Sequence, residues 1–104
     1  MSDSLVKNAG DEGQVAKAAK EEKNAELRFK EDMATVLSSK QGRRVIWRLL
    51  EECKVFNSVW DPTERIRYLV GKQDLGHQVL AWVTNCSEDA LLMMMKEAKE
   101  LKNV

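Results

Sequence analysis

Hydrophobic residues in this chain recur at intervals of three and four over most of its length, which is the pattern of amphipathic α-helices. The clearest case is residues 42–56, where Ser39 is placed to act as the N-cap. No segment alternates apolar and polar residues with the β-branched enrichment of a strand. The pattern predicts an all-α protein, a small bundle of three to four helices with a mobile or projecting N-terminal arm. The apolar face of the clearest helix consists of Ile46, Leu49, Leu50, Cys53 and Phe56.

A second helix start is predicted at Asp61, Pro62 and Glu64. In this interpretation the aspartate caps the free amides, the proline takes the first helical position, and the glutamate completes a capping box. We therefore expect a helix from Pro62 to about Asn85.

Apolar residues form two stripes along that expected helix, so we expect it to be sandwiched between neighbours. Gly71 and Gly76 interrupt it, each at a cost of about 1 kcal/mol relative to alanine. They predict either a close approach of another helix or a kink. One stripe consists of Ile66, Leu69, Val70, Leu80 and Val83, and the other of Tyr68, Leu75, Val79 and Trp82.

The last predicted helix follows Ser87, which is placed as its N-cap. Three consecutive methionines in it cannot all face one core. Met94 and Met95 fit the inner face, whereas Met93 falls outside it and is a candidate for a subunit contact. The predicted inner face consists of Leu91, Met94, Met95, Ala98 and Leu101.

The N-terminal segment carries few large apolar residues, and residues 1–13 are expected to be mobile unless a partner holds them. From Gln14 the composition favours a helix that extends to about Ser38 and docks through its C-terminal half. Residues 1–24 are thus predicted to be a flexible or partner-ordered arm, and residues 25–104 a helical domain. A frayed, solvated tail and an arm that reaches another subunit are both compatible with this pattern.

Length and charge limit the classes of function. The 104 residues suffice for one domain with a modest core. The 17 basic and 17 acidic residues give no net charge, so no global field drives binding to nucleic acid or membrane. Residues 33–72 are nevertheless basic, with eight Lys or Arg against four Asp or Glu.

No catalytic, metal or cofactor site is predicted. Cys53 and Cys86 lack a ligand or redox spacing and are expected to be reduced and buried. His77 is the only histidine and has no ligand at metal-binding spacing. The segment between Gly71 and Gly76 lacks the Lys and Ser/Thr of a phosphate loop. The absence of an apolar leader or of a run of about 18 apolar residues predicts a protein made in a reducing cytoplasm and no membrane association.

Candidate partner-binding residues gather around the helix at residues 42–56. Its basic cluster, which Lys40 extends, supports three interpretations: a solvated, internally paired face, a grip on carboxylates of another protein, or contact with DNA phosphates. Exposed tryptophans would mark the rim of an interface. The candidate residues are Arg43, Arg44, Arg48, Trp47, Trp60 and Met93.

The block from Gly42 to Phe56 begins Gly-Arg-Arg, continues with a Trp- and Leu-rich helix and ends in Cys-x-Val-Phe. Together with the later pair Gly71 and Gly76, it resembles a family of small proteins encoded in the structural gene clusters of tailed bacteriophages. A virion protein of a Bordetella phage typifies that family. The resemblance covers about residues 32–97. It departs from the family pattern where Lys72 and its neighbour follow Gly71 in place of two arginines.

This resemblance implies a phage virion or assembly component and brings no catalytic residues. We expect a non-enzymatic protein of the virion that packs as a homo-oligomer and against other virion proteins, either portal and tail proteins or internal ones. The alternative is a cytoplasmic phage effector that binds one host protein. A DNA-contacting adaptor is a third possibility.

Overall fold

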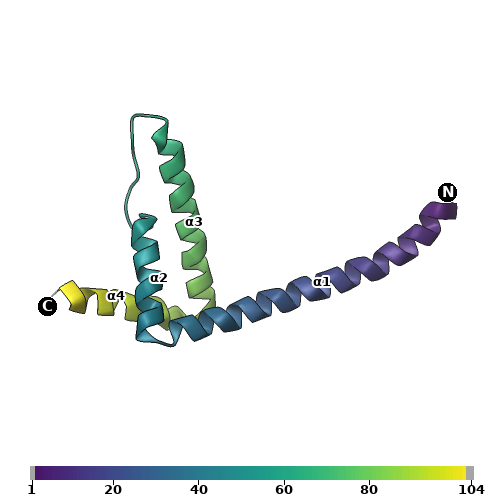
Figure 1. The fold of residues 1–104 in the computed structure, drawn as a ribbon, viewed down its shortest axis with the longest axis horizontal. Coiled ribbons are helices and arrows are strands. Elements are labelled where there is room, and N and C mark those ends of the chain that lie inside the picture. The colour runs from purple at the N-terminus through teal and green to yellow at the C-terminus, as the bar shows by residue number, and fades with distance from the viewer. Residues whose placement is uncertain (1, 103–104) are drawn as a thin grey trace. The chain divides into compact units, whose positions relative to one another are not determined.

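The computed structural model describes the backbone of residues 2–102 and the side chains of residues 12–102. The described chain contains four helices and no strand, which confirms the all-α prediction (Figure 1). None of these helices is long and apolar enough to cross a membrane. They are α1 (Ser2–Leu37), α2 (Lys40–Glu52), α3 (Arg65–Cys86) and α4 (Glu88–Lys102).

The chain divides into two compact units, Met1–Glu31 and Asp32–Val104. The first unit contains most of α1, and every side chain described in it, from residue 12 to residue 31, is exposed. The helix reaches back to Ser2, through a segment whose composition predicted mobility. Whether residues 1–24 are flexible or ordered by a partner stays a prediction.

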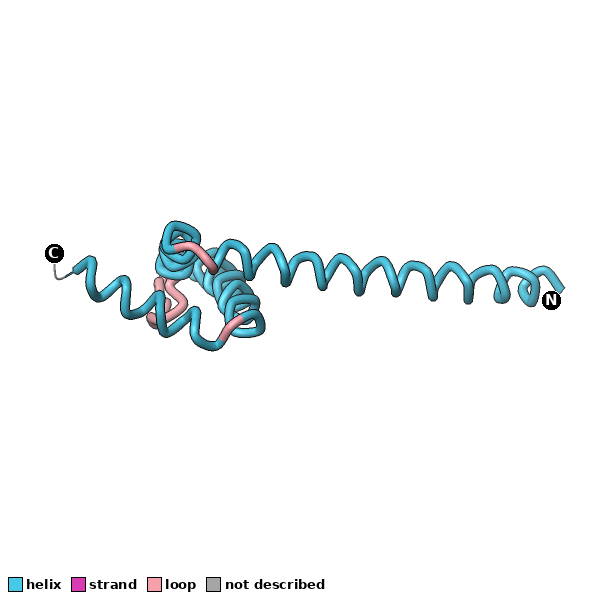
Figure 2. Tube along the Cα trace, turned by 90° about the horizontal axis from the view of Figure 1, so that it is seen from below, coloured by secondary structure: helices cyan, strands magenta, loops and turns pink. Residues whose placement is uncertain are grey.

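The second unit is built on α2 and α3, which run antiparallel and side by side, with α4 crossing them near the end at which α3 finishes (Figures 1 and 2). The last residues of α1, which belong to this unit, contribute to the same core. Its most deeply buried side chains are those of Leu50, Val83 and Met94. The core as a whole consists of Met33, Leu37, Leu50, Cys53, Val55, Val79, Val83, Ala90 and Met94.

Two serines begin helices of this unit as predicted. The Oγ of Ser39 accepts a hydrogen bond from the Gly42 amide at 2.9 Å, at the start of α2. The Oγ of Ser87 accepts one from the Ala90 amide at 3.2 Å, at the start of α4. Each bond satisfies an amide that has no partner within its helix.

The chain turns sharply after α2. Lys54 adopts a left-handed conformation with φ of 57°, and the Val55 amide donates back to the carbonyl oxygen of Leu50 at 3.2 Å. Gln73 of α3 holds the turn from the other side, because its amide nitrogen donates to the carbonyl oxygens of Lys54 and Asn57 at 2.8 and 2.7 Å. The turn thereby places the Val55 side chain in the core.

The two glycines of α3 have different surroundings. A Cβ at Gly76 would collide with the Cβ of Cys53 and with a methyl group of Val55, so α3 approaches the end of α2 closely there. A Cβ at Gly71 would meet no atom within 4 Å. The predicted close approach therefore holds for Gly76, and crowding does not explain Gly71.

The prediction that Asp61 caps α3 is wrong. The helix begins at Arg65, and Asp61 does not cap its amides. The Asp61 carboxylate instead accepts hydrogen bonds from the hydroxyl and the amide of Thr63, which close a turn two residues long. These bonds hold the pKa of Asp61 below its ordinary value of 3.8, and the bond from the Thr63 hydroxyl has the larger effect. Both bonds go to Oδ1 and neither donor belongs to α3, so Asp61 orders the turn before the helix rather than the helix itself.

Two predictions about buried faces are also wrong. The second apolar stripe of α3 is not sandwiched, since Tyr68 and Leu75 are 62% and 53% exposed. Helix α4 crosses α3 only near the C-terminal end of α3, so no other element of this unit covers the first half of that stripe (Figure 2). Met95 is 40% exposed because the buried line of α4 runs through Ala90 and Met94, about 100 degrees away around the helix.

Candidate partner-binding site

A small groove lies between α2 and α4. Its empty volume is about 270 Å³, including the part open to solvent. The lining combines apolar and basic side chains, a combination suited to a protein segment rather than a metabolite. Helix α2 contributes Lys40, Arg43, Arg44 and Trp47, and α4 contributes Met94, Glu97, Ala98 and Leu101.

Arg43 lines the groove and joins three elements. Its Nε donates to Oε1 of Glu97 on α4 at 2.6 Å, and its Nη1 donates to the carbonyl oxygen of Leu37 at the end of α1 at 2.9 Å. Both side chains of the ion pair are mostly buried, with exposed fractions of 12% and 18%. Charged hydrogen bonds in such surroundings are stronger than surface ion pairs. This guanidinium is therefore committed to contacts within the chain.

Trp47 forms the apolar wall of the groove. Its ring stacks on Phe56, with ring centroids 5.4 Å apart and planes 27° apart. This contact ties the middle of α2 to the turn that follows the helix and fixes the indole in one orientation. Because Phe56 is 46% exposed, the aromatic pair also presents an apolar surface to solvent.

Lys40 and Arg44 are the free cations of the groove. Both are exposed, and neither forms an ion pair with another residue that the structure describes. They lie one helical turn apart on α2, about 6 Å along its axis. Arg48, by contrast, is outside the groove and pairs with Glu52 at 3.2 Å, as one of the interpretations of the sequence predicted.

Residues 33–96 match the family model described as Bbp19-like phage protein. The chain belongs to this family. The match confirms the resemblance to a phage family typified by a Bordetella phage protein and covers nearly the same residues. No curated protein and no solved structure matches the chain.

The Bbp19-like region holds the wall of the groove that α2 provides, including its Arg-Arg pair and Trp47. It ends before Glu97, Ala98 and Leu101, which are three of the four residues that α4 contributes to the groove, and it leaves out residues 12–31. The family match therefore covers the α2 side of the groove and, on the α4 side, Met94 alone.

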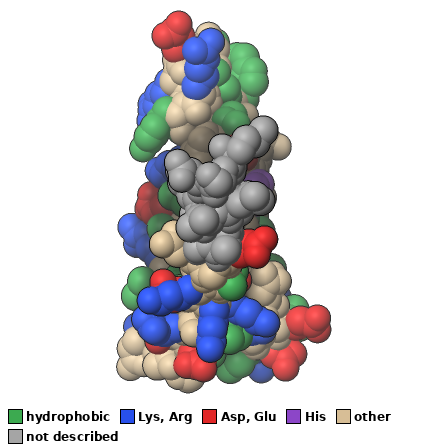
Figure 3. All heavy atoms as spheres, turned by 90° about the vertical axis from the view of Figure 1, so that its right-hand side faces the viewer, with side chains coloured by type: hydrophobic (Ala, Val, Ile, Leu, Met, Phe, Trp, Pro, Cys, Tyr) green, Lys and Arg blue, Asp and Glu red, His purple; other side chains and the backbone are tan. Residues whose placement is uncertain are grey.

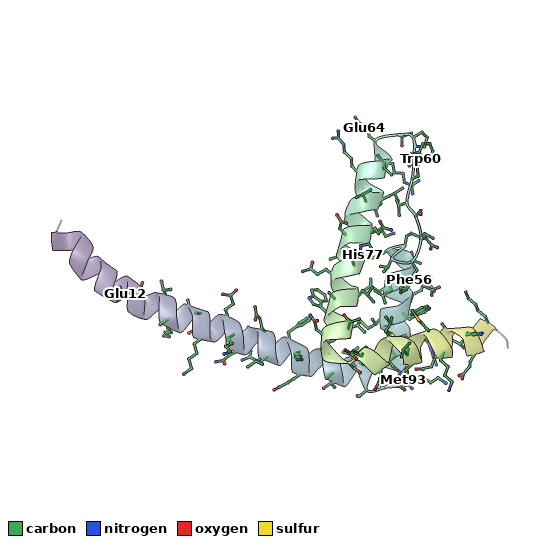
Figure 4. All side chains as sticks on the ribbon, turned by 180° about the vertical axis from the view of Figure 1, so that it is seen from behind. Glu12, Phe56, Trp60, Glu64, His77 and Met93 are labelled. Atoms are coloured by element: carbon green, nitrogen blue, oxygen red, sulfur yellow. The ribbon has the colours of Figure 1, made fainter. Side chains whose placement is uncertain are left out.

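Of the six predicted partner-binding residues, three line the groove: Arg43, Arg44 and Trp47. The other three lie apart from it. Figure 4 shows Trp60 in the connection between α2 and α3, where it is 78% exposed, and Met93 on α4, where it is 46% exposed. Arg48 is the third.

Sequence reasoning placed Lys40 in the basic cluster but did not select it as a site residue. Its position four residues before Arg44 could have done so, since that spacing puts both cations on one helical face. Leu101 was assigned to the inner face of α4, yet it is 56% exposed at the edge of the groove.

His77 and the two cysteines make packing contacts within the fold. The imidazole Nε2 of His77, on α3, lies 3.4 Å from the carbonyl oxygen of Val55, in the turn that follows α2. Cys53 is buried against Gly76, whereas Cys86, which was also expected to be buried, is half-buried; neither forms a disulfide. Within the described residues, no three His, Cys, Asp or Glu side chains are grouped to hold a metal ion.

Proposed function

We propose that this phage protein is a non-enzymatic structural or assembly component of the virion, present in repeated copies, that binds protein partners through the groove between α2 and α4. The observation that carries this proposal is the arrangement in the groove of two exposed, unpaired cations, Lys40 and Arg44, beside an ordered apolar wall. Protein interfaces typically combine an aromatic anchor with arginine in this way.

The charges favour a protein partner over DNA. Arg43 is held by Glu97 and by a backbone carbonyl, and Arg48 is paired with Glu52. This leaves Lys40 and Arg44 as the free cations of the cluster. Affinity for DNA rises with the number of phosphates that are neutralised, and two cations neutralise few of them. The face drawn in Figure 3 likewise intersperses basic, acidic and hydrophobic side chains rather than presenting one sign of charge.

The location of the protein tests the proposal. Quantitative mass spectrometry of purified particles is expected to find it at many copies per virion. Its absence from particles would overturn the structural role and favour the alternative, a cytoplasmic effector that binds a host protein.

A pair of variants tests the groove. Particles made with Arg44→Glu are expected to incorporate much less of the protein, because a carboxylate in the groove repels an acidic partner. Particles made with Arg48→Glu are the matched control, since the same change of charge on the same helix lies outside the groove. Equal incorporation of the two variants would remove the groove from the proposal.

A further inference from the structure

The outward face of α4 exposes two large apolar side chains. Leu92 is 65% exposed and Met95 is 40% exposed, whereas the buried side of the helix carries Ala90 and Met94. Leu92 and Met95 are three residues apart and therefore lie one above the other on the same face. A single exposed apolar pair is common on protein surfaces, so the charges around it decide whether this face suits a partner.

Charged side chains surround this apolar pair in a regular order. Along the same face, Glu88 precedes the pair by one turn and Lys99 follows it by one turn. Asp89 and Lys96 lie together on one flank of that face. All four side chains are exposed, and none forms an ion pair with another residue that the structure describes. The helix dipole accounts for charges in the first and last turns but not for Lys96, which lies near the middle of α4.

A second copy of α4 that runs antiparallel has the complementary order of side chains. Positions 88, 92, 95 and 99 are spaced by four, three and four, which is the spacing of the seam between two packed helices. The seam is symmetric about the midpoint between residues 93 and 94. A two-fold axis at that point therefore brings apolar side chains against apolar ones and acidic side chains against basic ones. The pairs brought together, each of them twice, are Leu92 with Met95, Glu88 with Lys99, and Asp89 with Lys96.

The same charges disfavour a parallel arrangement. A parallel pair would place each residue of the seam against its own copy, so Glu88 would meet Glu88 and Lys99 would meet Lys99. The antiparallel pair has no such contact along the seam. Met93, which was predicted as a subunit contact, lies about 100 degrees from Leu92 on the side away from Met95 and falls outside the seam.

We propose that two copies of this protein associate through an antiparallel pair of α4 helices, related by a two-fold axis that passes between residues 93 and 94. The contact is isologous, because each copy contributes the same surface. It goes beyond the proposed function, since the groove residues Met94, Glu97 and Leu101 lie on the other side of α4. The dimer therefore presents two open grooves, and a partner that carries two acidic segments would bind it with increased avidity.

The short seam sets the expected affinity of the dimer. Four residues of each helix form it, so the interface is expected to be smaller than the roughly 1,200 Å² above which stable complexes are found. Both helices are already folded in the monomer, and pairing therefore does not have to order them. We expect a dissociation constant between about 10 µM and 1 mM.

The first test compares two neighbouring substitutions in the full chain. Light scattering measures molar mass at protein concentrations up to about 2 mM, where the wild-type protein is expected to approach the mass of a dimer. Leu92→Lys is expected to raise the dissociation constant more than about tenfold, because it places a charge against the apolar side chain of Met95. Met93→Lys adds the same charge one residue away, outside the seam, and is expected to leave association unchanged.

The second test reverses the charges and fixes the direction of the pairing. The double variant Glu88→Lys with Asp89→Lys makes the whole face basic, and Lys96→Glu with Lys99→Glu makes it acidic. Each is expected to stay monomeric alone, and an equimolar mixture of the two is expected to form heterodimers. The protein that combines all four substitutions is expected to regain self-association. Circular dichroism of each variant confirms that α4 remains helical.

Three results would overturn the inference. The first is a wild-type chain that stays monomeric up to about 2 mM. The second is equal association of Leu92→Lys and Met93→Lys, and the third is a mixture of the two charge variants that does not associate. Each result is distinguishable from failure of the proposed function, because these tests use purified protein. The role in the virion and in the groove is tested separately, by the content of particles.

Discussion

The close approach of α2 and α3 at Gly76 leads to a prediction with a built-in control in the same helix. Gly76→Ala places a methyl group against Cys53 and Val55, whereas Gly71→Ala places the same group in open space. Both substitutions gain helix propensity. Only one of them disturbs the packing, so the two are expected to change the stability of the protein in opposite directions.

The magnitude follows from the contact distances. The new carbon at position 76 would lie 2.5 Å from a methyl carbon of Val55, while carbon atoms in contact are normally about 3.5–4.0 Å apart. The Cβ of Cys53 is fixed to its backbone and cannot rotate away, so α3 has to move by about 1 Å. Overpacking of this kind costs about 1–3 kcal/mol, and helix propensity returns about 1 kcal/mol. We expect a net loss of about 1–2 kcal/mol for Gly76→Ala, from the upper half of that range, and a gain of about 0.5–1 kcal/mol for Gly71→Ala.

Urea unfolding followed by tryptophan fluorescence measures both changes. Trp47 and Trp82 pack against the core, so their emission reports the unfolding of the second unit rather than of the N-terminal helix. The slope of free energy against urea is expected to stay constant in both variants. If Gly76→Ala stabilised the protein as much as Gly71→Ala does, the helices would not be in contact at residue 76 and the argument would be refuted.

Three further predictions concern polar groups. Arg43→Gln is expected to destabilise the protein by about 2–3 kcal/mol, because it leaves the mostly buried carboxylate of Glu97 without its partner. Arg48→Gln breaks an exposed ion pair and is expected to cost less than about 0.5 kcal/mol. Urea unfolding of the two variants measures both changes. Gln73→Ala is expected to speed amide hydrogen exchange in the turn after α2, since it removes two hydrogen bonds, and unchanged exchange would contradict that role. Asp61 is expected to titrate below its ordinary pKa in an NMR experiment, so its contribution to stability is present above about pH 4 and is lost as the pH falls through the lowered pKa. Asp61→Asn should remove that pH dependence, and an Asp61 that titrates at its ordinary pKa would contradict the turn geometry.

Local features of the sequence determined much of this fold. The spacing of apolar residues gave the all-α class, and the serines at positions 39 and 87 were identified as caps because capping depends on residues two or three positions away. The helix predicted at residues 42–56 is a core element, with Leu50 among the most buried side chains, but its predicted end is wrong: the helix ends at Glu52, because Lys54 takes a left-handed conformation and turns the chain. Three of the eight residues that line the groove, Arg43, Arg44 and Trp47, had been selected from the same helix.

Only the tertiary structure decided the roles of other residues. Arg43 and Arg44 are adjacent in the sequence, yet one is held by Glu97, 54 residues away, and the other remains free beside the groove. Gly71 and Gly76 have equal propensities, but only the second lies against the turn after α2. The physical reason is the same in both cases: helix periodicity is set by neighbours in the sequence, whereas burial and pairing depend on which distant element occupies the space beside each face.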